Sequence, residues 1–474
     1  MYVKSITLDS IRGFKKLEFN FQRPDHSYAG WTVFLGGNAS GKSTLLRSIA
    51  LAVIGPDAGR LLLGNPESWR GWMHADDRRA EVKATLTWDP HFDRFKTKGA
   101  SPGIFFDAGV RFALEGKDGG DNGDRQGGEL PTLRAVEKRI AGTRVLTVIR
   151  GPWEPNALGW FSAGYGPMRR LTGSSSESLR FSLDQSCVSR FVTLFREDAA
   201  LSESEAWLKT NHSRWLESQK PELKELLDRV TALLSDNLLP QGMRISKTTV
   251  DHVFVQDARN VELPMRDISD GCRGIYATVL DLVHGMFSVY GIEGLFGEDT
   301  SGRPIVNMPG VVLIDEIEAH LHPAWQRDIP EWFKLHFPKV QFFVTTHSPL
   351  VAQAADPNGV FLLPSPADLN SEPRPLEDDE IERLRLGRAE KTLLGVAFGL
   401  KSVRSRWANA QIGKYKRLNA KAKSGASLSG DEATELKGLE KQMEIAFEPV
   451  LSDSTPLGSS LSDAASVVSA PRAN

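Results

Sequence analysis

Residues 36–44 read Gly-Gly-Asn-Ala-Ser-Gly-Lys-Ser-Thr, which matches the pattern G-x-x-x-x-G-K-[ST] of a phosphate-binding loop. The apolar run 31–35 precedes this loop, and residues 43–53 follow it with the apolar spacing of a helix. A glycine loop between a strand and a helix turns backbone N–H groups toward an anion. A chance glycine turn is the alternative, and the flanking elements argue against it. We therefore expect the following residues to contact a bound nucleotide: Gly36, Asn38, Ala39, Ser40, Gly41, Lys42, Ser43 and Thr44.

Two acidic residues follow a second apolar run, residues 311–314. Because unbroken apolar runs are typical of buried parallel strands, Asp315 and Glu316 are expected at the strand end that meets the phosphate loop. An acidic pair after a strand is common, so the phosphate loop upstream gives this one its weight. We expect Asp315 and the Ser43 hydroxyl to hold Mg²⁺, and Glu316 to act as general base toward an attacking water.

A histidine ends a third apolar run, residues 340–345. A lone histidine is more often structural. His347 follows a buried strand, where a side chain can meet a terminal phosphate and the attacking water. We expect a catalytic role for it.

A second anion-binding device is expected at residues 267–274, which read Asp-Ile-Ser-Asp-Gly-Cys-Arg-Gly and lead into a helical stretch, residues 275–289. A simple helix cap is the alternative. One nucleotide does not need two phosphate cradles on one subunit. We therefore expect Ser269 and Gly271 to serve the nucleotide of a neighbouring protomer.

Composition bounds the class of protein. The 474 residues are 40% hydrophobic and 25% charged, which is ordinary for a globular chain with more than one domain. With 58 basic and 60 acidic residues, net charge favours neither presence nor absence of a nucleic-acid partner. Two cysteines exclude a disulfide framework, and we find no leader or membrane-spanning run. The expected location is the cytoplasm, with no membrane partner.

The expected fold is α/β, with a mostly parallel sheet and antiparallel N-terminal strands, split by a helical insert. The predicted turn at Arg12 joins the first two strands, and Arg12 is a further candidate nucleotide contact. In the insert, five leucines and Val230 fall on one helix face after Pro221. A surface loop is expected at residues 116–128. The predicted parts are an N-terminal core (1–173), a helical insert (174–240), a second core part (241–365), a charged helical region (366–450) and a disordered tail (451–474).

The order of these motifs resembles the ABC-type ATPases of the SMC, RecF and OLD group. By this resemblance residues 36–44 are Walker A, 268–274 the signature loop, 311–316 Walker B, and His347 the switch histidine. Ile-Ser-Asp-Gly departs from the usual Leu-Ser-Gly-Gly, although Asp is familiar in the OLD-like branch. The long separation of Walker A and Walker B fits an inserted lobe better than an AAA+ hexamer module. The resemblance implies an ABC-type head that binds ATP and Mg²⁺ and hydrolyses ATP between paired protomers.

Three further stretches, 164–170, 194–208 and 393–400, resemble the ATPase subunits of Septu-type anti-phage systems and of retrons that carry the same ATPase. In that family a separate HNH nuclease is the effector. The resemblance places Arg169 near the nucleotide, whereas Trp207 is expected to serve packing.

Three functions follow as hypotheses. The preferred one is a defence ATPase that forms homodimers or higher even-numbered homo-oligomers and controls a nuclease in trans. The second is a RecF-like or SMC-like ATPase of DNA repair or maintenance. The third, less favoured, is a nuclease in its own right, as in OLD proteins, but the acids at 377–382 lie in a charged helical run instead of at strand ends.

A basic segment without acidic residues spans 401–423 and leaves a DNA or RNA contact open. The alternative is a solvated helix balanced by the acids that follow. Its cationic residues are Lys401, Arg404, Arg406, Lys414, Lys416, Arg417, Lys421 and Lys423.

Overall fold

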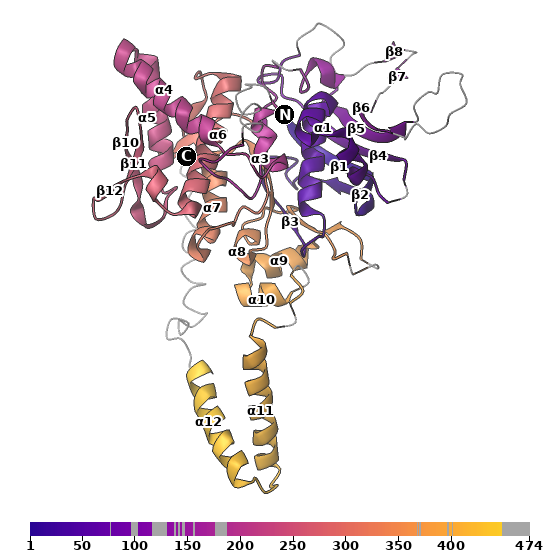
Figure 1. Ribbon diagram of the computed structural model, residues 1–474, viewed down its shortest axis with the longest axis vertical. Helices are drawn as coiled ribbons and strands as arrows, with labels where there is room; N and C mark the ends of the chain where they lie inside the picture. The colour runs from indigo at the N-terminus through magenta and orange to yellow at the C-terminus, as the bar shows by residue number, and fades with distance from the viewer. Residues whose placement is uncertain are drawn as a thin grey trace, which may run out of the picture. The chain divides into compact units, whose positions relative to one another are not determined.

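The computed structural model describes residues 1–75, 77–95, 103–115, 130–136, 139–140, 143–144, 147–154, 157–175, 187–366, 368, 371–395, 398–400 and 402–447. It divides into two compact units, Met1–Gly399 and Leu400–Asn474 (Figure 1). The expected loop at 116–128 and the tail at 451–474 lie outside the described residues.

The unit boundary lies inside the segment 366–450, which the sequence predicts as one charged helical region. Strand β18 (Arg374–Pro375) joins the central sheet of the first unit. Helices α9 (Asp378–Leu386) and α10 (Ala389–Leu394) pack on α8 (Pro349–Ala352). The two compact units meet between Gly399 and Leu400, and the predicted division of the chain into parts stays a prediction.

The central sheet has the strand order β18-β17-β3-β16-β15-β9 and is parallel from β17 to β9. Its parallel strands are β17 (Val360–Leu362), β3 (Gly30–Leu35), β16 (Val340–Thr345), β15 (Gly310–Ile314) and β9 (Ser162–Tyr165). Successive side chains alternate between two cores: Val312 and Ile314 enter one, and Val311 and Leu313 the other. Both faces are buried, which explains the unbroken apolar runs in the sequence.

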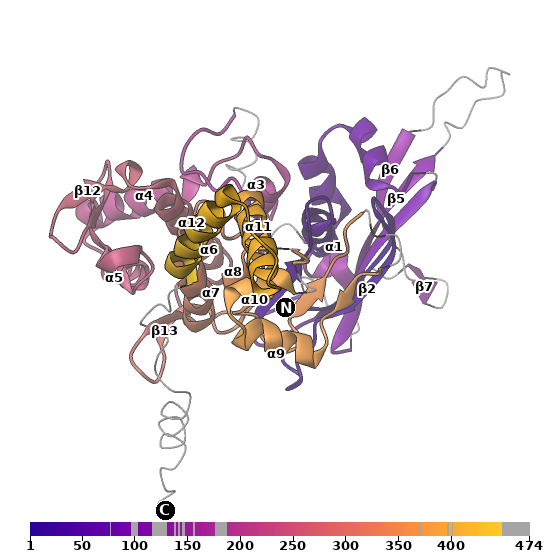
Figure 2. The ribbon, with the colours of Figure 1, turned by 90° about the horizontal axis from the view of Figure 1, so that it is seen from below.

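One face of the central sheet packs against helix α1 (Lys42–Leu63) and an antiparallel sheet of order β2-β1-β4-β5-β6. The strands of that sheet are β1 (Tyr2–Ile11), β2 (Phe14–Asn20), β4 (Arg79–Thr87), β5 (Phe105–Glu115) and β6 (Leu130–Ala135). Figure 2 shows α1, β5 and β6 together on the side away from α4 and α5. The predicted α/β fold with antiparallel N-terminal strands is confirmed.

The other face is covered by α4 (Ser202–Ser218), α5 (Pro221–Ser235), α6 (Asp270–Tyr290) and α7 (Pro323–His336). The predicted apolar face of α5 buries Leu226, Leu227, Val230, Leu233 and Leu234, and Pro221 is its first residue. Helix α6 begins at Asp270, four residues before the predicted end of the loop at Gly274, because Ser269 already takes the position before the first helical turn.

The smaller elements complete the first unit. A three-stranded sheet contains β10 (Arg244–Thr248), β11 (Val253–Gln256) and β12 (Glu262–Pro264). One two-stranded sheet pairs β13 (Phe296–Glu298) with β14 (Pro304–Val306), and another pairs β7 (Arg139–Ile140) with β8 (Thr143–Arg144). The other helices described in this unit are α3 (Val192–Phe195) and the short 3₁₀ helices η1 (Pro66–Trp72), η2 (Thr147–Arg150), η3 (Ser189–Phe191), η4 (Pro240–Gly242) and η5 (Met265–Asp267).

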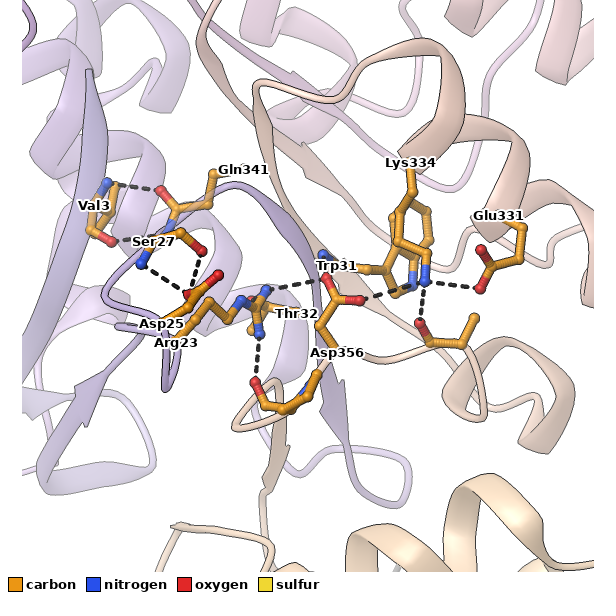
Figure 3. A network of polar contacts seen from close by, with 12 residues as sticks. Val3, Arg23, Asp25, Ser27, Trp31, Thr32, Glu331, Lys334, Gln341 and Asp356 are labelled. Atoms are coloured by element: carbon orange, nitrogen blue, oxygen red, sulfur yellow. Dashed lines mark hydrogen bonds and ion pairs between the residues drawn. The ribbon is translucent and has the colours of Figure 1, made fainter. Parts of the chain in front are cut away.

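Buried polar contacts tie the antiparallel sheet to the central sheet (Figure 3). The Gln341 side chain on β16 accepts a hydrogen bond from the Val3 N–H and donates one to the Val3 carbonyl, both at 2.8 Å. Near the start of β3, Asp356 accepts from the Trp31 N–H at 2.6 Å, and Arg23 donates to Thr32 at 2.9 Å. Because a buried amide without partners is costly, Gln341 helps to fix the register between the two sheets.

The second unit contains helices α11 (Arg406–Lys423) and α12 (Gly430–Phe447). Lys414 pairs with Glu435 at 2.9 Å and Lys421 with Glu432 at 2.7 Å, so the helices run antiparallel. No residue of α11 is buried within the described part of this unit. The hairpin thus holds a basic helix beside an acidic one.

Among the residues that the structure describes, no helix has the length and apolar character needed to cross a bilayer.

Candidate functional site

Four neighbouring parallel strands end level with one another and carry the candidate residues at their carboxyl ends. Residue Val344 of β16 pairs with Val33 of β3 and with Ile314 of β15, and Ile314 pairs with Tyr165 of β9. The segments that follow these strands are the phosphate loop, the turn with His347, the acidic pair, and residues 166–170. Ligand sites of α/β sheets lie at this edge.

The phosphate loop has the backbone that its glycines permit. Gly36, Ala39 and Gly41 all have positive φ, at 157°, 61° and 93°. A side chain on Gly41 would come within 2.5 Å of the Phe14 ring, so glycine is required there for space as well as conformation. The Ser40 hydroxyl is buried without a hydrogen-bond partner among the described residues, whereas Asn38 is exposed.

Lys42 folds back over the loop that precedes it. Its Nζ donates hydrogen bonds to the carbonyls of Gly36 and Gly37, both at 2.9 Å. Burial lowers the pKa of Lys42, and the nearby carboxylates Asp315, Glu316 and Glu318 oppose that shift. The ammonium therefore lies between the phosphate loop and the acidic turn.

Thr345, the last residue of β16, fixes the acidic pair. Its hydroxyl donates to Asp315 Oδ1 at 2.5 Å and accepts from the Glu316 N–H at 2.8 Å. Asp315 is only 2% exposed, and Glu316 has a positive φ of 47°, so the turn after β15 is sharp. The second carboxylate oxygen of Asp315 remains available to a ligand.

Arg169 lies beneath this turn and is 7% exposed. Its guanidinium donates to the carbonyls of Gly166 and Asp315 at 2.8 Å, of Glu316 at 3.1 Å and of Ile317 at 3.2 Å. Burial lowers the pKa of Arg169 to about 10. Arg169 thus holds the backbone of the acidic turn. That it lies near the bound nucleotide, as the family resemblance implies, stays a prediction.

Arg12 lies beside the first turn of α1. Its Nη1 donates to the Thr44 hydroxyl at 3.2 Å, and its guanidinium stacks on the Trp72 ring at 4.3 Å. Burial lowers the pKa of Arg12, and the positive charge of Arg47 adds to the shift. Thr44 is therefore already engaged, which leaves Ser43 as the first-turn hydroxyl available to a cation.

Ser269 and Gly271 lie at the N-terminus of α6. Ser269 is exposed, and its side chain makes no capping hydrogen bond to the helix. A side chain on Gly271 would come within 2.3 Å of the His320 carbonyl, so α6 begins in direct contact with the segment after the acidic turn. Within the described residues, no hydrogen bond or ion pair joins Ser269 or Gly271 to residues 36–44.

The donor set fits a nucleotide with Mg²⁺. The loop backbone, the Lys42 ammonium and the start of α1 suit phosphates. Asp315 and Ser43 offer the oxygen ligands that Mg²⁺ prefers. The Ser40 hydroxyl, which is buried and has no hydrogen-bond partner in the part of the chain that the structure describes, is a group that a bound phosphate would satisfy.

Comparisons with known proteins agree with this arrangement. A family model described as "AAA domain, putative AbiEii toxin, Type IV TA system" matches residues 174–352, and one described as "AAA domain" matches residues 5–75. The first region contains Ser269, the acidic pair and His347, and the second contains the phosphate loop. The two regions that match ATPase-domain models therefore contain the candidate phosphate-binding and catalytic residues.

The named relatives of this chain belong to retrons and to Septu systems. Retron Ec83 probable ATPase of Escherichia coli is 32% identical over 122 residues, 26% of this chain and 20% of that protein. Septu protein PtuA of Bacillus mycoides strain KBAB4 is 22% identical over 349 residues, 74% of this chain and 38% of that protein. The chain therefore spans well under half the length of either relative. A solved structure of an Smc head bound to the C-winged helix domain of ScpA is 14% identical over 76% of this chain and 94% of the other, with a TM-score of 0.41.

Sequence reasoning missed two residues of the candidate site, Thr345 as the support of the acidic pair and Glu318. Glu318 Oε1 accepts from the His347 N–H at 2.5 Å. The signal in the sequence that could have indicated Glu318 is its place two positions after Glu316. Trp207, which the sequence predicts as packing, stacks on His284 with ring centroids 4.7 Å apart.

Proposed function

We propose that the chain is an ATP-hydrolysing subunit of an anti-phage defence complex, in which two protomers close each ATP site head to tail. Hydrolysis then controls a separate HNH-type nuclease. The observation that carries the paired site is the exposed Ser269 at the start of α6, which no hydrogen bond joins to the phosphate loop of its own chain among the described residues. The named Septu and retron relatives support the defence role.

Each residue has a definite task in this proposal. The loop 36–44 holds the phosphates, with Lys42 moving from the Gly36 and Gly37 carbonyls to the outer phosphates. Glu316 accepts a proton from the attacking water, which adds to the terminal phosphorus as the bond to the leaving ADP oxygen breaks. Mg²⁺, held by Ser43 and Asp315, would neutralise charge on the phosphates. His347 contacts the terminal phosphate and the water.

Substituting the exposed serine tests the paired site. In Ser269→Arg, turnover is expected to fall about 100-fold or more, because a preorganised anion contact is replaced by a clash. Binding of ATP to the monomer should change by less than about 2-fold, since the phosphate loop is untouched. Steady-state ATPase rates and fluorescent-ATP titration measure the two quantities. Ser218→Arg, on the exposed end of α4, is the matched control.

Mixing protomers makes this test specific. Lys42→Ala and Ser269→Arg should each be inactive alone. A 1:1 mixture should recover ATPase turnover, up to about half of the wild-type rate if every protomer pairs into a mixed dimer, because each mixed dimer has one intact site. An inactive mixture, or normal turnover in Ser269→Arg, would rule out the composite site.

The alternative that the chain is itself a nuclease finds no support in the segment 377–382. Glu377 and Glu380 form a capping box at the start of α9, and Glu380 also pairs with Arg374 at 2.7 Å. These two acidic residues therefore stabilise the N-terminus of α9. Cleavage of DNA by the purified chain with Mg²⁺ alone would reverse this preference, whereas copurification of an HNH protein from the native host supports the proposed partner. A RecF-like or SMC-like maintenance ATPase remains the second candidate.

The basic helix α11 is the candidate nucleic-acid contact. Lys414 and Lys421 face α12, where they pair with acids, and Lys416 and Lys423 lie about 200° further round the helix, away from it. We expect Lys416→Glu, Arg417→Glu and Lys423→Glu together to weaken DNA or RNA binding and to reduce its salt dependence. Electrophoretic mobility shifts over a salt series measure both. Lys437→Glu with Lys441→Glu, on the exposed face of α12, is the charge control. Unchanged DNA and RNA binding would indicate that α11 is a solvated helix without a nucleic-acid contact.

A further inference from the structure

Glu318 connects two parts of the site that come from different strands. Its Oε1 accepts the His347 backbone N–H at 2.5 Å. Its Oε2 is buried and has no hydrogen-bond partner among the described residues. The residue itself belongs to the turn that Arg169 holds from beneath. A half-buried carboxylate with one oxygen unsatisfied is costly, and such groups in native proteins call for a specific reason.

The His347 loop is fixed on its other side by Ser348. The Ser348 N–H donates to the Thr346 hydroxyl at 2.9 Å, and the Ser348 hydroxyl donates to Gln326 at 2.7 Å while accepting from the first N–H groups of α8. Glu318 supplies the remaining contact, at residue 347 itself. The His347 side chain is exposed, so its direction depends on how the backbone is held.

The charges around Glu318 explain how a carboxylate is kept there. The Glu318 charge acts on Lys42 and is the leading charge acting on the buried Arg169. Two cations thus offset the cost of burying its negative charge. The Glu318 carboxylate therefore interacts electrostatically with Lys42 of the phosphate loop and with Arg169 beneath the acidic turn, and it is hydrogen-bonded to the His347 backbone.

We propose that Glu318 is a positioning residue for ATP hydrolysis, which holds the His347 backbone so that the imidazole meets the terminal phosphate and the attacking water in one orientation. The inference rests on the proposed ATP hydrolysis. It assigns Glu318 no contact with the substrate. Its expected effect on turnover is transmitted through the backbone hydrogen bond to His347.

A double-mutant cycle tests this dependence. Glu318→Ala and His347→Ala are each expected to lower kcat about 10- to 100-fold, because misplacing a catalytic group by about 1 Å has an effect of that order. The ATP dissociation constant should stay within about 2-fold. The double variant should be no slower than the slower single variant, because both remove the same contribution. A double variant whose loss of kcat equals the product of the two single losses would overturn the proposal.

Conservative and matched variants separate positioning from stability. Glu318→Gln keeps an acceptor oxygen for the His347 N–H, so its kcat should remain within about 3-fold of wild type. Glu222→Ala, at an exposed position of α5, controls for loss of a glutamate. A Glu318→Gln variant as slow as Glu318→Ala would contradict the hydrogen-bond role.

Hydrogen exchange gives a readout that does not need turnover. In the nucleotide-free protein, amides of the segment 345–348 should exchange about 10-fold faster in Glu318→Ala and at the wild-type rate in Glu318→Gln. Unchanged exchange in Glu318→Ala overturns the positioning role even if the ATPase is active. An inactive wild-type protein with the expected exchange pattern would instead refute the proposed ATPase function and leave the Glu318 contact established.

Discussion

Glu316→Gln is expected to abolish ATP turnover and to trap the ATP-bound protein as a dimer. The substitution keeps the size of the side chain and removes the base that accepts the proton from water, so kcat should fall about 100-fold or more. The backbone of the turn is held by Thr345 and Arg169, which the substitution does not touch. Steady-state phosphate release and light scattering after size exclusion, with and without ATP, measure the two effects.

The controls for this prediction separate chemistry from assembly. Glu331→Gln, on an exposed glutamate of α7, should leave turnover and mass unchanged. Lys42→Ala in the same protein should prevent the ATP-dependent dimer, because the phosphates lose their lysine. An ATP-bound Glu316→Gln protein that stays monomeric would count against closure of the site by two protomers.

Arg169→Ala is expected to lower the free energy of unfolding by about 3 kcal/mol or more, because it leaves several buried carbonyls without a charged donor. Turnover should be lost as well, since those carbonyls belong to Asp315, Glu316 and Ile317. Urea unfolding followed by circular dichroism gives the stability, and ATPase assays below the transition give the activity.

Neighbouring variants show whether the effect is specific. Arg169→Lys should recover little, because one ammonium cannot reproduce the planar fork that reaches four carbonyls. Arg170→Ala changes an exposed side chain whose guanidinium contacts the Met168 sulfur at 3.7 Å, and it should leave stability within about 0.5 kcal/mol. Equal stability of Arg169→Ala and Arg170→Ala would show that the acidic turn keeps its shape without Arg169.

The sequence was sufficient for the parts of the site that are contiguous. The phosphate loop, the acidic pair and His347 each follow a short apolar run, and the sheet places these runs side by side as predicted. The antiparallel N-terminal strands were predictable for the same reason. A strand's period and its closing residues are local properties.

The supports of the site could not be predicted in this way. Thr345, Arg169 and Glu318 act through contacts between segments far apart in the chain, such as that from Arg169 to the Asp315 carbonyl. Nothing in the residues around Arg169 distinguishes a guanidinium that binds phosphate from one that binds backbone. The start of α6 was placed too late for a related reason, because Asp270 and Gly271 are as typical of loops as of a first helical turn.

The close approach of Gly271 to the His320 carbonyl has a consequence for communication between protomers. In the proposed dimer, the N-terminus of α6 contacts the ATP of the neighbouring protomer. The same N-terminus packs against His320, which follows the acidic turn of its own chain. Because there is no room for a side chain between them, a displacement of one backbone segment is expected to press on the other. In the proposed dimer, release of phosphate from one site is therefore expected to shift the N-terminus of α6 that completes the other site, so that hydrolysis at the two sites is coupled.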